Sequence, residues 1–208
     1  MYKSISRLLR RFRSETQGSM SVEAVLFLPL LLWAITATYT FFDVYKVQNN
    51  TYRANYTISD MLSRETGAIN SAYTDGLYSV FQYMTEADPN NSWIRVSVIN
   101  CVQDCGGDDR VLQFDWSQGV NGALGRIDED LPTMNDIIPL FSLGDRLILV
   151  ETSSDYEPPF KSSLTNFSAR TIKTNVATRP RFAPQLLWEG PGSGVADAED
   201  SPEGPGTS

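Results

Sequence analysis

Residues 24–42 read AVLFLPLLLWAITATYTFF, and no charged residue interrupts them. A helix needs about 20 predominantly apolar residues to span the hydrocarbon core of a bilayer. The stretch therefore predicts one membrane-spanning helix, at residues 19–43 once its flanks are included. A secretory signal peptide has a shorter apolar core of about 7–15 residues and a small-residue cleavage site after it. No clear site of that kind follows here, and the charged flanks argue against a buried core helix.

The charges on the two sides of this stretch are unequal. Residues 1–18 hold five basic residues and one acidic residue, whereas the whole chain has a formal net charge of −8, so the remainder carries −12. Under the positive-inside rule, residues 1–18 are a basic cytoplasmic leader, and the chain beyond about residue 43 lies in the periplasm of a bacterial inner-membrane protein. The acidic body argues against a nucleic-acid partner, because phosphates are neutralised by lysine and arginine.

A short motif stands directly before the apolar stretch and reads Gly18-Ser19-Met20-Ser21-Val22-Glu23. It resembles the class III signal of type IV pilin-like proteins, in which a peptidase cleaves after the glycine and a glutamate is the fifth mature residue. The resemblance implies cleavage between Gly18 and Ser19, with the apolar stretch retained. A carboxylate near hydrocarbon is costly unless it is paired, and in pilins its partner is the new amino terminus of a neighbouring subunit. The alternative is that Glu23 rests in the headgroup layer.

Beyond residue 43 the apolar residues recur at spacings of three and four. This spacing predicts that one helix runs from about residue 22 to residue 66, with Gly67 as its stop. A second helix is expected to begin at residue 70 or 71 and to end before Pro89, with Leu77 and Phe81 on one face. The two helices are expected to form a hairpin.

From residue 93 the apolar period changes to two, which is typical of strands. Strands are expected near residues 94–98, 112–116, 147–156 and 169–176, with one or two short helices between residues 121 and 141. The predicted fold class is α+β, in which a long membrane-spanning helix continues into a helical hairpin packed on a small, mainly antiparallel sheet. The periplasmic domain covers residues 44–189. Residues 190–208 are rich in Gly, Pro, Ser and acids, and we expect a disordered acidic tail.

The chain has no histidine and two cysteines, Cys101 and Cys105. The missing histidine removes the commonest general base and metal ligand, and two thiols alone do not complete a zinc site. In an oxidising periplasm the two cysteines are expected to form a local disulfide, with free thiols as the alternative. No nucleophile or phosphate-binding motif is recognised, so we expect no enzyme activity, no metal and no cofactor.

Three stretches resemble the TadE-like family of the tight-adherence (Flp-type) pilus system. They are residues 11–32, with the Val22-Glu23 pair and the apolar run; residues 58–64, ISDMLSR; and the strand at Val150-Glu151 with its end at residues 156–160. The resemblance implies a pseudopilin or minor pilin that a prepilin peptidase processes. Its partners would be other pseudopilins, the major pilin and the inner-membrane assembly platform, and it would support surface attachment, either inside the fibre or from the membrane.

Two other functions remain open. One is a single-pass, membrane-anchored periplasmic binding or sensing domain, for which Gly18 and Glu23 are accidental. The other is a membrane-tethered enzyme that uses carboxylate chemistry.

Overall fold

The computed structural model describes residues 19–107, 109–160 and 168–190. The leader at residues 1–18, with Gly18, and the tail from residue 191 onward therefore lie outside the described residues. By compactness the chain divides into two units. The N-terminal unit comprises residues 1–45 and 157–169, and the sheet unit comprises residues 46–156 and 170–208.

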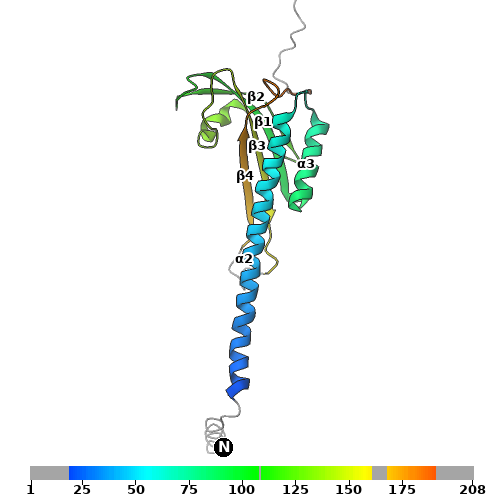
Figure 1. Ribbon diagram of the computed structural model, residues 1–208, viewed down its shortest axis with the longest axis vertical. Coiled ribbons are helices and arrows are strands. Elements are labelled where there is room, and N and C mark those ends of the chain that lie inside the picture. The colour runs from blue at the N-terminus through cyan, green and yellow to red at the C-terminus, as the bar shows by residue number, and fades with distance from the viewer. Residues whose placement is uncertain (1–18, 108, 161–167, 191–208) are drawn as a thin grey trace, which may run out of the picture. The chain divides into compact units, whose positions relative to one another are not determined.

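Helix α2 (Ser19–Arg64) is continuous over 46 residues (Figure 1). The predicted helix at residues 22–66 is confirmed, and the structure starts it three residues earlier and ends it two residues earlier. Pro29 lies inside the helix, where it removes one backbone donor. The helix ends before Gly67 with a tighter turn, in which the Glu65 N–H donates to the Leu62 carbonyl over 3.3 Å.

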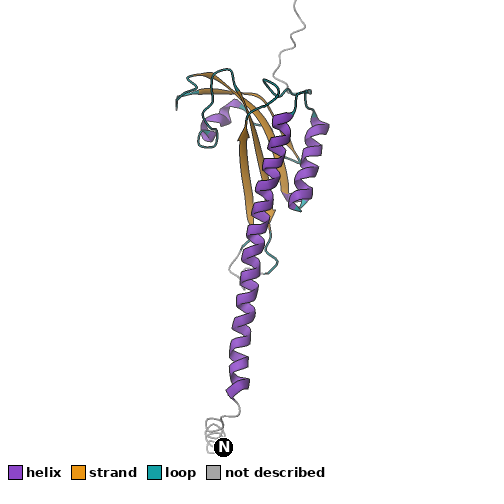
Figure 2. Ribbon diagram, viewed as in Figure 1, coloured by secondary structure: helices purple, strands orange, loops and turns teal. Residues whose placement is uncertain are grey.

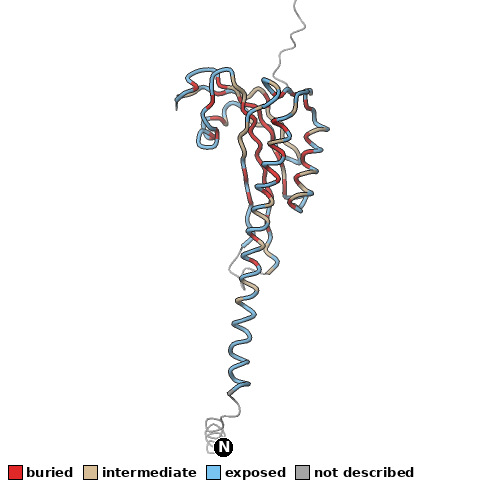
Figure 3. Tube along the Cα trace, viewed as in Figure 1, coloured by how far each residue is buried: buried red, intermediate tan, exposed pale blue. Residues whose placement is uncertain are grey.

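In the N-terminal unit the large apolar residues of α2 are exposed, and Figure 3 colours the first turns of the helix as exposed. Its hydroxyl side chains bond within the helix, because Thr36 Oγ1 donates to the Trp33 carbonyl and Thr40 Oγ1 to the Thr36 carbonyl, each over 2.9 Å. Within the same unit, the rings of Tyr39 and Phe160 meet edge to face, with centroids 5.9 Å apart. The hydroxyls of Thr36 and Thr40 are therefore satisfied within the helix, without water.

Helix α3 (Ser71–Thr85) is the second helix that the sequence predicts. Its start is fixed by Asn70, whose side chain accepts a hydrogen bond from the Tyr73 N–H over 3.1 Å, the usual way to satisfy an orphan donor at a helix start. It ends at Glu86, which adopts the left-handed conformation with φ 55°. Figure 2 shows α3 beside the later turns of α2.

Four antiparallel strands form one sheet in the order β2-β1-β3-β4. They are β1 (Ser92–Gln103), β2 (Val111–Val120), β3 (Arg146–Tyr156) and β4 (Arg170–Thr178). All four strands occur where the sequence predicts them, and all three pairings are antiparallel. Strand β3 is buried continuously from residue 147 to residue 154, so its first half is covered on both faces.

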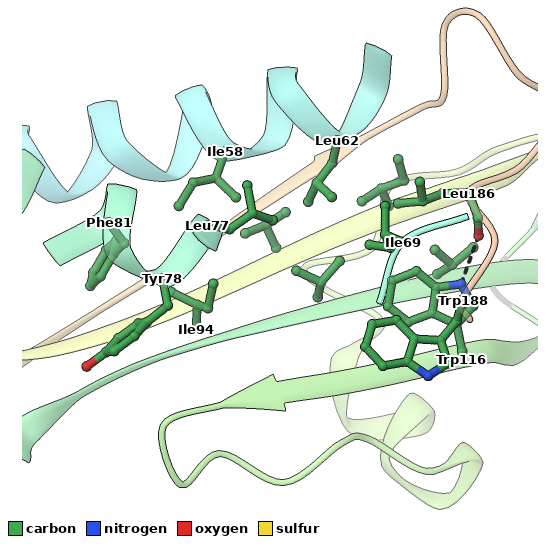
Figure 4. Packing of buried hydrophobic residues seen from close by; sticks show 14 of the residues in the cluster. Ile58, Leu62, Ile69, Leu77, Tyr78, Phe81, Ile94, Trp116, Leu186 and Trp188 are labelled. Atoms are coloured by element: carbon green, nitrogen blue, oxygen red, sulfur yellow. Dashed lines mark hydrogen bonds between the residues drawn. The ribbon is translucent and has the colours of Figure 1, made fainter. Parts of the chain in front are cut away.

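The main core lies between one face of the sheet and the two helices of the sheet unit. Ile58 and Leu62 of α2, Phe81 of α3 and Ile94 of β1 are fully buried there (Figure 4). At the end of this core the ring centroids of Trp116 and Trp188 lie 5.3 Å apart. The indole N–H of Trp116 donates to the Leu186 carbonyl over 2.8 Å, so residues after β4 close the core.

A buried polar link crosses the same interface. Asn55 of α2 is fully buried and donates to Thr174 Oγ1 over 2.9 Å and to the Val150 carbonyl over 3.4 Å. Thr174 also shares a 2.6 Å hydrogen bond with Thr152. The apolar faces bring helix and sheet together, and the two hydrogen bonds from the Asn55 amide nitrogen favour one register between them. The amide oxygen of Asn55 has no partner among the described residues.

A second apolar cluster occupies the opposite face of the sheet, at one end. It includes Ile99, Leu112, Leu131 and Phe141. The 3₁₀ helix η3 (Asp128–Met134) supplies Leu131; a shorter 3₁₀ helix, η2 (Pro89–Asn91), precedes β1. The sequence predicts one or two short helices between residues 121 and 141, and the structure has a 3₁₀ helix with Pro132 inside it.

Candidate functional site

The residues of the processing motif lie at the start of α2. Gly18 is outside the described residues, and Ser19 is the first residue of the helix. Glu23 follows one turn later and is exposed. Because side chains four apart on a helix are neighbours, the Glu23 carboxylate and the Ser19 position share one face, ahead of the apolar segment. This arrangement places an acid where a cation could approach it.

Helix α2 is the one helix in the described residues that is long and apolar enough to cross a membrane, and its best 18-residue window has a mean hydropathy of 1.9. Its exposed apolar side chains include Val25, Leu26, Phe27, Leu28, Leu30, Leu31, Leu32 and Ile35. Residues 24–42 would extend about 28 Å at 1.5 Å per residue, which matches a hydrocarbon core of about 30 Å. Exposed apolar patches of this extent mark surfaces that contact another protein or a membrane.

The second candidate site lies on the face of the sheet that the helices leave open. Glu151 of β3 is only 8% exposed. Arg95 stands opposite it on β1, and their side chains meet at 3.0 Å. A second guanidinium, from Arg126, donates to the other carboxylate oxygen over 2.8 Å. The carboxylate is therefore held between two arginines.

The charge of Glu151 follows from this pairing. Burial raises its pKa, but hydrogen bonds from Arg126 and Arg95, together with their positive charges, outweigh burial and hold the pKa below its usual value. Glu151 is therefore ionised at neutral pH. Pairing of this kind is needed, because an isolated buried carboxylate would be strongly destabilising.

Close backbone packing positions Arg126. The loop after β2 folds back over that strand, and the Arg126 N–H donates to Ser117 Oγ over 2.8 Å. A Cβ at Gly125 would stand 2.4 Å from the Ser117 carbonyl oxygen, and one at Gly119 would stand 2.2 Å from the Ala123 carbonyl oxygen. Only glycine permits such approaches, so these two glycines bring the arginine over the sheet.

A hollow of about 400 Å³ opens around this ion pair. Its walls include Trp93, Arg95, Arg126 and Glu151, with Lys173 and Asn175 of β4. The Arg95 guanidinium lies 4.8 Å from the centre of the Trp93 ring and also donates to the Leu124 carbonyl over 2.6 Å. The hollow combines an aromatic ring, fixed positive charge and hydrogen-bonding groups, which are the components of a polar ligand site.

The disulfide that the sequence predicts is present in the structure. Cys101, near the end of β1, and Cys105, in the following turn, form a disulfide with Cα atoms 5.8 Å apart. Both are buried beside the second apolar cluster. The bond fastens the β1 end to the turn that leads to β2. Among the described residues, no group of three or more His, Cys, Asp or Glu could hold a metal ion.

Sequence reasoning missed the arginine pair. The alternating pattern of β1 makes Arg95 an outward residue, and no pattern in the sequence distinguishes Arg126. The sequence does hold one signal: Glu151 directly follows the apolar run at residues 147–150, and an acid in a buried strand needs a partner. The partner's identity depends on register and on the loop after β2, which the sequence pattern does not specify.

Comparisons with known proteins identify no relative of this chain. No family model, no curated protein and no solved structure matches the chain.

Proposed function

We propose that this chain is a pilin-like subunit of a tight-adherence pilus system, anchored in the bacterial inner membrane by the first half of α2. The observation that carries the proposal is the continuity of α2. One half is apolar and exposed, and the other half packs on an antiparallel sheet. A single helix that serves both as anchor and as core helix is the arrangement expected of pilin-like proteins.

The motif at the helix start supports the same proposal. A prepilin peptidase would cleave between Gly18 and Ser19, so the mature chain would begin with the first described residue of α2. The new α-amine of Ser19 in one subunit would then pair with Glu23 of a neighbour. This pairing would offset the cost of a carboxylate beside hydrocarbon and would order subunits within the membrane.

Topology follows from the charges. The basic leader would stay in the cytoplasm under the positive-inside rule, and the sheet unit would lie in the periplasm. The Cys101–Cys105 disulfide supports this orientation, because such bonds persist in oxidising compartments. Partners would be other pseudopilins, the major pilin and the assembly platform.

The test is the mass of the intact protein extracted from membranes of cells with and without a prepilin peptidase. We expect a chain that begins at Ser19, and we expect Gly18→Ala to retain residues 1–18. Gly67→Ala is the matched control, because a Cβ there meets no atom closer than 3.8 Å. A chain that keeps its leader in cells with the peptidase would reject the proposal, and so would a chain that begins beyond about residue 38.

A membrane-anchored periplasmic binding domain is the second candidate function. The hollow beside Glu151 favours it, because it offers a ligand site on a face that the helices do not cover. The same mass measurement separates the two functions, since a plain anchored domain would keep residues 1–18.

A further inference from the structure

The hollow beside Glu151 has more positive than negative charge. Arg95 and Arg126 share one carboxylate, Glu151, and Lys173 adds a third cation on the exposed side of β4. Asp130 also approaches Arg126, at 3.7 Å, with both side chains partly exposed. Among the described residues, no carboxylate lies within 4.0 Å of the Lys173 ammonium. In a chain of net charge −8, this is a local cationic surface.

The hollow lies beside an open sheet edge. Strand β4 is last in the strand order and, within the part of the chain that the structure describes, pairs only with β3 (Figure 1). Along it, Ile172 and Thr174 are buried, while Lys173 and Asn175 are exposed and line the hollow. Because successive side chains alternate between faces, a peptide paired with this edge would place every second side chain on the same face as Lys173.

A free small anion is the weaker fit to this site. Both guanidiniums already bond Glu151, and Lys173 is exposed, where a single ion pair contributes little. An extended peptide would add main-chain hydrogen bonds along β4, which supply most of the affinity when a strand joins a sheet edge. The lysine also has a simpler role, since a charge on an edge strand deters self-association. The positive charge of Lys173 would, however, attract an extended segment that carries acidic side chains.

We propose that the outer edge of β4 and the adjoining hollow bind an extended acidic segment of a partner protein. Its main chain pairs with β4, and its carboxylates on the side of the hollow lie against Lys173. The site rests on the sheet unit alone, so it holds whether or not the leader is cleaved.

The test uses the full chain in detergent and a fluorescent eight-residue peptide that alternates threonine and glutamate, with binding followed by anisotropy. We expect binding that Lys173→Glu weakens about fivefold to tenfold, since the change removes one attraction and adds one repulsion. Lys46→Glu is the matched control: it makes the same charge change at an exposed lysine of α2 and should leave binding unchanged. An unchanged circular dichroism spectrum of Lys173→Glu would show that the sheet remains folded.

Two further peptides test the two halves of the proposal. Replacing each glutamate by glutamine should weaken binding about as much as Lys173→Glu does, and N-methylation of alternate main-chain amides should abolish it while keeping every charge. Equal binding by either peptide overturns the proposal. A uronic-acid oligomer that competes as well as the acidic peptide would also overturn it.

Residues 191–208 of the chain contain four acidic residues and no basic one. They could therefore supply the acidic segment in place of a partner protein. A chain shortened to residue 190 provides the control. If it binds the peptide at least tenfold more tightly than the full chain, the chain's own segment is the ligand and a partner protein is not. Equal affinity of the two chains supports a partner.

Discussion

The two halves of α2 share one backbone conformation but differ in what surrounds them. From Met20 to Phe42 the helix exposes almost every large apolar side chain. From Thr51 to Ser63 it buries a stripe that contains both apolar Ile58 and polar Asn55. The difference shows that helix formation depends on the local sequence. Whether an apolar side chain of that helix stabilises the fold depends on what packs against it. Changes in the second half should alter folding of the sheet unit, and changes in the first should alter membrane association.

The largest effect is expected from Ile58→Asp. The change deletes a fully buried side chain, which alone costs about 2–5 kcal/mol, and adds an unpaired charge to the core. The sheet unit should not fold. The measurement is urea unfolding in detergent, followed by fluorescence of the buried tryptophans.

The adjacent exposed position provides the control for Ile58. Thr57→Asp makes the same acid on the outer side of the same turn, and its effect should stay within about 0.5 kcal/mol. If both variants unfold at the same urea concentration as the unaltered chain, the packing described for the second half of α2 is wrong.

Glu151→Ala tests the face of the sheet that α2 does not cover. It leaves two partly buried guanidiniums without their carboxylate, and breaking a buried pair in this way costs about 3–5 kcal/mol. Equilibrium unfolding gives the loss directly. A loss of unfolding free energy below about 1 kcal/mol would mean that water solvates the two guanidiniums once the carboxylate is removed.

The same pair predicts a pH dependence. Because the folded-state pKa of Glu151 is lowered, its ionised form stabilises the fold above the unfolded-state pKa of about 4.3. That contribution is lost as the pH falls through the folded-state pKa. The stability difference between the unaltered chain and Glu151→Gln should therefore shrink below about pH 4. A difference that stays constant with pH would remove the electrostatic explanation.

Leu28→Arg tests the first half of α2. A central arginine opposes membrane insertion by about 2.5–3.5 kcal/mol, so a larger fraction of the protein should be released by alkaline carbonate. Leu28→Phe should remain in the membrane, and the urea midpoint of the sheet unit should not move. Retention of Leu28→Arg in the membrane would show that lipid contact is not what holds this segment.

The smallest expected effect is that of Asn55→Ala. Thr174 keeps its hydrogen bond with Thr152, so the loss should be about 1–2 kcal/mol, as for an ordinary buried hydrogen bond. Asn49→Ala, on an exposed position of the same helix, should be neutral. Equal effects of the two changes would argue against a role for Asn55 in setting the helix–sheet register.

Much of the fold was predictable because it depends on local pattern. The apolar run and the spacing of three and four predicted α2, the period of two located the first two strands, and a continuous apolar run located the third. The site on the open sheet face was not predictable. Glu151 and Arg95 lie 56 positions apart and meet through the β1–β3 register, and Arg126 reaches them only because Gly119 and Gly125 allow a loop to lie against β2.

The amino-acid sequence by itself determined the helix, its apolar half, the charge asymmetry and the positions of the strands along the chain, because each follows from neighbours within a few residues. Tertiary structure alone decided which charges meet. The strand order β2-β1-β3-β4 puts Arg95 beside Glu151 and leaves β4 at an edge. The physical reason is that ion pairs and open edges depend on distances across the sheet, and those distances exist only once the strands have paired.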